Sequence, residues 1–94
     1  MKRVAFLIRT REDQWEGLRS SLGLALENNR VVMVVLDHEV EMTEAYRENL
    51  ELFLEMDGEC YSNLPANVEK YGFKPITLEE LGEKLKEIDC IIPF

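Results

Sequence analysis

The sequence has little of what marks several classes of protein. Its 94 residues include two cysteines, three prolines and five glycines, and no apolar run approaches the ~20 residues of a membrane span. Two cysteines are too few for a disulfide scaffold, and no charged leader followed by an apolar stretch opens the chain. We therefore expect a cytoplasmic protein with no membrane segment.

The apolar content is sufficient for one hydrophobic core. Hydrophobic residues make up 46% of the chain, and we place a single domain at residues 1–94. A domain of this size buries roughly 60–70% of the surface that its unfolded chain exposes, so it folds without disulfides. One core excludes a catalytic domain joined to a separate substrate domain.

The negative charge is concentrated in one segment. The net charge is −8, and the segment 37–59 carries nine acidic residues against Arg47 alone, which accounts for the whole excess. The chain lacks the positive surface that a phosphate backbone requires, so we expect no direct binding of nucleic acid. The acidic segment is either a solvated helix face or a docking surface for a basic partner.

Blocks of apolar residues predict alternating strands and helices. Apolar runs predict strands at 4–8, 31–36, 59–63, 73–76 and 90–92, of which 31–36 is typical of the middle of a parallel sheet. Helical spacing predicts helices at 14–28, 42–56, 65–71 and 77–88. Strict alternation predicts an α/β fold, a three-layer α/β/α Rossmann-like domain with a mainly parallel five-stranded sheet.

The candidate binding site is formed by the loops at the carboxyl ends of the strands, where such sheets bind ligands. The candidate side chains are Arg9, Thr10, Arg11, His38, Ser62 and Asn63. No glycine follows the first strand, which excludes a dinucleotide fingerprint and a P-loop, and we expect no cofactor. The two arginines either bind an anion or are solvated loop residues.

His38 is the only histidine, and Asp37 and Glu39 flank it. Consecutive strand residues point to opposite faces, so the three side chains converge on a metal ion only if the chain turns there. No second histidine or cysteine lies nearby at ligand spacing, and we predict no metal site. The alternatives for His38 are proton transfer and an ordinary polar loop.

The two cysteines differ in their expected surroundings. Cys90 fits a small buried hydrophobe in the last strand. Cys60 lies a few residues before a strand-to-helix junction, and the N-terminus of a helix stabilises a thiolate. Cys60 is therefore the candidate catalytic residue, with burial inside its strand as the alternative.

The predicted elements form one pattern over nearly the full chain. It consists of the strands 4–8 and 31–36, the small-residue-rich helix 16–26 between them, the leucine-rich last helix and the strand 89–92. This pattern resembles the DsrE/DsrF/DsrH-like family of sulfur-relay proteins. The resemblance implies a Rossmann-like subunit in homo-oligomers (dimer, trimer or hexamer) or hetero-oligomers with related subunits. In active members it implies a cysteine persulfide after the third strand, exchanged with donor and acceptor proteins.

The chain departs from that family pattern in the loop 62–65, which reads Ser-Asn-Leu-Pro and has no cysteine. Either Cys60 is the carrier, which makes the protein at most a sulfurtransferase-type sulfur carrier, or the chain is a non-catalytic oligomeric binding subunit. Leu52 and Met56 lie outside the main apolar stripe of their helix and are candidates for a subunit interface.

Overall fold

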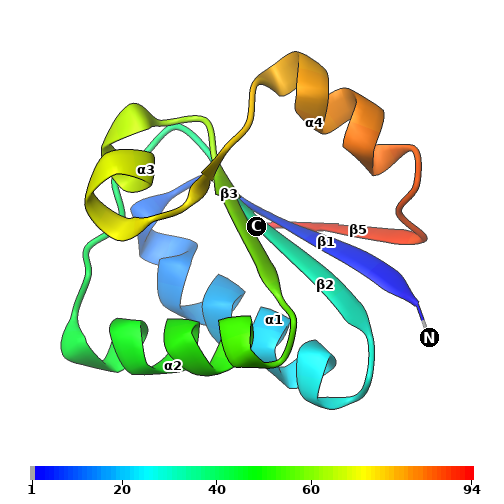
Figure 1. Cartoon of the computed structure of the whole chain (residues 1–94), viewed down its shortest axis with the longest axis horizontal. Helices are drawn as coiled ribbons and strands as arrows, with labels where there is room; N and C mark the ends of the chain where they lie inside the picture. Colours follow the sequence, from blue (N-terminus) through cyan, green and yellow to red (C-terminus); the bar gives the residue numbers. More distant parts are fainter. Residues whose placement is uncertain (1) are drawn as a thin grey trace.

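The computed structural model describes residues 2–94 and shows a five-stranded parallel sheet between helices (Figure 1). The strands are β1 (Arg3–Ile8), β2 (Arg30–Val35), β3 (Glu59–Ser62), β4 (Lys74–Pro75) and β5 (Cys90–Pro93). The helices are α1 (Gln14–Leu26), α2 (Glu44–Glu55), α3 (Pro65–Tyr71) and α4 (Leu78–Leu85), and a 3₁₀ turn, η1 (Arg11–Asp13), precedes α1. The predicted order of elements and the three-layer α/β/α class are confirmed.

The strand order is β4-β3-β2-β1-β5, so the β-branched strand β2 is central, as the sequence predicts. In the register of the central pair, Val4 lies opposite Val31 and Ile8 lies opposite Val35. The chain adds β2, β3 and β4 on one side of β1, and α4 then crosses to place β5 on the other side. The order of strands therefore reverses between β1 and β5, and β5 is an edge strand.

Two cores lie on the two faces of the sheet. Figure 1 shows α1 and α2 on one face and α4 on the other. Phe6 and Phe53 belong to the larger core under α1 and α2, and Ala5, Val34 and Leu81 belong to the smaller core under α4. Within residues 2–94, no helix is long and apolar enough to cross a membrane.

Local sequence signals set the ends of the helices. The hydroxyl of Thr43 accepts a hydrogen bond from the N–H of Tyr46 at 3.1 Å at the start of α2. Thr77 and Glu80 form the predicted capping box at the start of α4. Gly72 ends α3 with a φ of 75°, in the left-handed region that glycine adopts without a steric penalty.

The prediction that Cys90 is buried is wrong. Cys90 begins β5 and is exposed, because β5 lies at the edge of the sheet and has only β1 as a neighbour. An apolar run in the sequence indicates a strand but does not show whether that strand has one neighbour or two. The prediction that β2 lies in the middle of the sheet is correct, because β2 pairs with β1 on one side and with β3 on the other.

Gly17 allows α1 to pack closely against β1. A Cβ atom at this position would overlap the buried side chain of Ile8, whereas a Cβ atom at Gly23 in the same helix would have no heavy atom within 4 Å. We expect Gly17→Ala to lower the free energy of unfolding by about 1–3 kcal/mol. Gly23→Ala should raise it by about 0.5–1 kcal/mol, because alanine favours the helix. Urea unfolding measures both, and equal effects would contradict the close packing.

Candidate functional site

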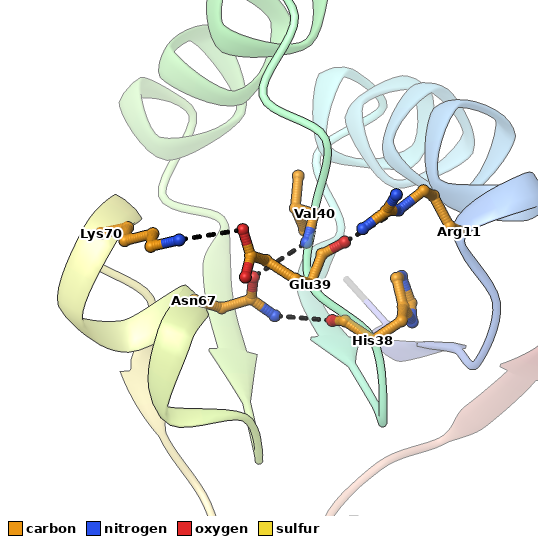
Figure 2. Close-up of polar contacts among 6 residues, drawn as sticks. All are labelled: Arg11, His38, Glu39, Val40, Asn67 and Lys70. Carbon is orange, nitrogen blue, oxygen red and sulfur yellow. Dashed lines mark hydrogen bonds and ion pairs between the residues drawn. The ribbon is translucent and has the colours of Figure 1, made fainter.

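The loops after β1, β2 and β3 meet at the carboxyl edge of the sheet, as the sequence predicts, and hydrogen bonds tie them together. Arg11 in the first loop donates from Nε to the carbonyl oxygen of Glu39 in the second, at 3.1 Å (Figure 2). Gln14 at the start of α1 is buried, and its amide donates to the carbonyl of Glu41 at 2.8 Å. The same amide accepts from the N–H of Glu41 at 3.0 Å. These bonds fix α1 against the loop that follows β2.

Asn67 connects the second loop with the third. Its side chain is fully buried, and its Oδ1 accepts from the N–H of Val40 at 2.9 Å. Its Nδ2 donates to the carbonyl of His38 at 2.9 Å and to the hydroxyl of Ser62 at 3.0 Å. Figure 2 shows Asn67 reaching from α3 to the chain between His38 and Val40. Both amide atoms are therefore used to hold the backbone in place.

Ser62 and Asn63, two of the predicted ligand-binding residues, have intramolecular partners. Asn63 accepts from the N–H of Asp37 at 2.9 Å and donates to its carboxylate at 2.8 Å. Asp37 has a φ of 62°, in the left-handed region, and its two hydrogen bonds with Asn63 hold the chain in this turn. The hydroxyl of Ser62 also accepts from the N–H of Leu64 at 3.1 Å. Both side chains therefore stabilise the loops around them.

His38 and its two acidic neighbours point to different partners. The His38 Nδ1 lies 2.8 Å from the carbonyl oxygen of Leu36, and because a carbonyl only accepts, Nδ1 carries the proton. Its Nε2 is buried without a hydrogen-bond partner. The carboxylate of Glu39 lies 3.2 Å from the amine of Lys70, on the side away from the His38 ring (Figure 2). Across residues 2–94, no cluster of three His, Cys, Asp or Glu side chains is placed to hold a metal ion.

The first loop leaves its two arginines at the surface. The hydroxyl of Thr10 donates to the carboxylate of Asp13 at 2.8 Å, across η1. Arg9 and Arg11 are exposed, and Arg11 uses one of its N–H groups for the bond to Glu39. Of the predicted candidates, these two arginines are the ones with charged atoms free for an anion.

Cys60 is in the middle of β3 rather than at the start of a helix. It lies opposite Met33 and is 5% exposed, while α3 begins five residues later at Pro65. Burial raises the pKa of the Cys60 thiol to about 12, and Lys74 opposes this rise only in part. The thiol is therefore protonated at neutral pH and is not stabilised by a helix N-terminus.

Cavities lie at both ends of the sheet. The one at the carboxyl edge has a volume of about 260 Å³ and a mainly apolar lining that includes Asn63, Pro65 and Ile76. A larger one of about 550 Å³ lies at the amino edge, between the ends of α1 and α2, and includes Ala25 and Met56. The loops that the sequence singled out thus do not border the larger cavity.

Sequence reasoning missed Asn67 and Gln14, the two buried amides that hold the loops together. Their partners Val40 and Glu41 are 27 residues away in the sequence. A polar residue inside a predicted helix is ordinarily solvated, so no local signal distinguishes these two side chains from exposed ones.

Asn67→Ala tests the role of the buried amide. We expect it to lower the free energy of unfolding by about 2–4 kcal/mol, because the N–H of Val40 would remain buried without an acceptor. Asn49→Ala is the matched control, since the one side-chain hydrogen bond of Asn49 within residues 2–94 goes to the carbonyl of Ala45 in its own helix. Its effect should stay within about 0.5 kcal/mol. Similar losses for both variants in urea unfolding would show that the amide network is not what holds the loops.

Comparison with known proteins identifies no family for this chain. No family model, curated protein or solved structure matches the chain. The similarity to DsrE/DsrF/DsrH-like proteins therefore rests on the sequence pattern alone.

Proposed function

We propose that the chain is a non-catalytic, oligomeric binding subunit of the DsrE/DsrF/DsrH-like type. The observation that carries this proposal is the state of Cys60, which is 5% exposed and has its pKa raised to about 12. A sulfur carrier acts through an accessible thiolate, because the thiolate attacks the bound sulfur. Cys60 provides neither the access nor the charge, and the loop after β3 has no other thiol.

Surfaces suited to binding lie on the helices and on the edge strand. The large apolar side chains that are exposed are Leu26, Leu52, Leu54, Met56, Leu78 and Ile91. They belong to α1, α2, α4 and β5 or adjoin these elements. Large apolar side chains at the surface favour contact with another protein over contact with water.

A second copy of the chain fits best on the face that α4 covers. Ile91 is 45% exposed there, and Leu7 beside it is half-buried, because a single helix covers this side of the sheet. The charges around α4 are of both signs, as in the ion pair between Glu83 and Lys86 at 3.1 Å. A two-fold axis can place opposite charges against each other on such a surface, whereas the acidic helix α2 would repel its own copy.

Thiol mapping tests the non-catalytic assignment. After exposure to a persulfide donor, we expect intact-mass and peptide analysis to find added sulfur on the exposed Cys90 and none on Cys60. Cys60→Ser should leave the added mass unchanged, and Cys60 should react only after unfolding. Reducible sulfur on Cys60 in the folded protein would contradict the proposal and favour the second candidate function, persulfide relay.

Self-association tests the oligomeric part. We expect the mass from sedimentation equilibrium to rise above the monomer value with concentration, and Ile91→Lys to shift the equilibrium to monomer by burying an unpaired charge. Leu54→Lys on α2 is the control, because its side chain is exposed on the other layer and should leave association unchanged. A monomer mass at every concentration would contradict the assembly.

A further inference from the structure

The two helices on the larger core expose apolar side chains on the flanks that face each other. Helices α1 and α2 pack side by side on one face of the sheet (Figure 1). Right-handed crossovers turn the flank of α1 that carries Leu22 and Leu26 towards α2, and the flank of α2 that carries Leu52 and Met56 towards α1. Leu26 is 55%, Leu52 41% and Met56 38% exposed. We call the surface formed by Leu26, Leu52 and Met56 the α1–α2 groove.

The groove opens at one end into the larger cavity. Met56 and Ala25 line that cavity of about 550 Å³ from the two sides, and Glu55 and Asp57 add carboxylates to its wall. The apolar surface therefore leads from the helix pair into a hollow whose polar rim holds three carboxylates and one arginine, Arg30. A long side chain with a cationic end fits such a hollow better than a purely apolar one.

A row of carboxylates runs beside the groove. Spacings of four, three and four residues place the following side chains on one stripe of α2: Glu44, Glu48, Glu51 and Glu55. All four are exposed, and in the part of the chain that the structure describes none forms an ion pair. The ion pairs there use Glu39, Glu59 and Glu83. We call these four residues the acidic ridge.

The charges of the acidic ridge are only partly balanced. Like charges three and four residues apart on a helix repel each other. Arg47 lies three residues after Glu44 and four before Glu51 and offsets part of this repulsion, but within residues 2–94 no basic side chain forms an ion pair with the ridge. A partner that brings lysine or arginine to the ridge would relieve the repulsion. The surface of such a partner must carry positive charge and, beside it, an apolar stripe that is as wide as the groove.

We infer that the α1–α2 groove binds a basic amphipathic helix of a partner protein, an inference that rests on the proposed binding function. The apolar face of that helix packs on Leu26, Leu52 and Met56, and its lysines and arginines pair with the acidic ridge. A third helix fits the space between two parallel neighbours by ridges-into-grooves packing. Nucleic acid, anionic lipid and a second copy of α2 all carry negative charge and are repelled.

The probe for the test is a synthetic amphipathic peptide of leucine and lysine, about 18 residues long so that it can form a helix. Trp15 is the only tryptophan and lies on the flank of α1 that carries Leu22 and Leu26, about 16 Å along the helix from Leu26. A peptide helix of 18 residues is about 27 Å long, so one that extends from the groove along α1 reaches Trp15 and changes its fluorescence. We expect saturable binding that weakens as salt is added. A scrambled peptide of the same composition, which has no apolar face, should not produce the fluorescence change.

Variants separate the charged from the apolar contribution. Neutralising the acidic ridge with Glu44→Gln, Glu48→Gln, Glu51→Gln and Glu55→Gln should weaken binding roughly tenfold and flatten its salt dependence. Leu52→Ser should weaken binding and leave the salt dependence in place. The matched control removes four exposed carboxylates outside the ridge and should bind as the unmodified chain does: Glu12→Gln, Glu69→Gln, Glu79→Gln and Glu87→Gln.

Equal binding of the scrambled peptide, unchanged binding to the neutralised ridge, or no binding at low salt would overturn the inference. Loss of self-association in Leu52→Ser would also overturn it, because the groove would then hold a second copy. If the peptide does not bind but self-association sensitive to Ile91→Lys persists, this inference fails and the proposed function stands. If both are absent, the proposed function fails as well.

Discussion

Burial of β2 on both faces is the constraint on which the rest of the fold depends. Val31–Val35 cannot remain in water, so the chain must place apolar cover on each side of the central strand. On one side α1 and α2 provide that cover and form the larger core with Phe6 and Phe53. On the other face of the sheet α4 provides the cover, and Ile91 remains 45% exposed there.

At the carboxyl edge, the polar side chains serve mainly to hold the protein together. Three side-chain amides form hydrogen bonds with backbone or side-chain groups of neighbouring loops: those of Asn67, Gln14 and Asn63. The amide atoms of these three side chains are therefore occupied by hydrogen bonds within the chain. The Cys60 thiol is likewise buried and neutral. The large apolar side chains that are exposed lie mainly on the helices.

The sequence predicts the elements of this fold because their signals are local. The run 31–36 indicates β2, the Thr77 and Glu80 pair indicates the start of α4, and Gly72 indicates the end of α3. The roles of Asn67 and the exposure of Cys90 depend on which distant segments lie beside them, and no local pattern encodes that. The same limit applies to Cys60, whose position two residues before the end of β3 decides between a reactive and a buried thiol.

The composition of β5 has a consequence for aggregation. An edge strand normally offers N–H and C=O groups to which further strands can add without limit. Phe94 donates its N–H inward to the carbonyl of Leu7, so the outward position belongs to Pro93, which has no N–H to offer. The proline interrupts the outward hydrogen-bond row that amyloid-like sheet extension needs, so this edge of the sheet is a poor template for a further strand.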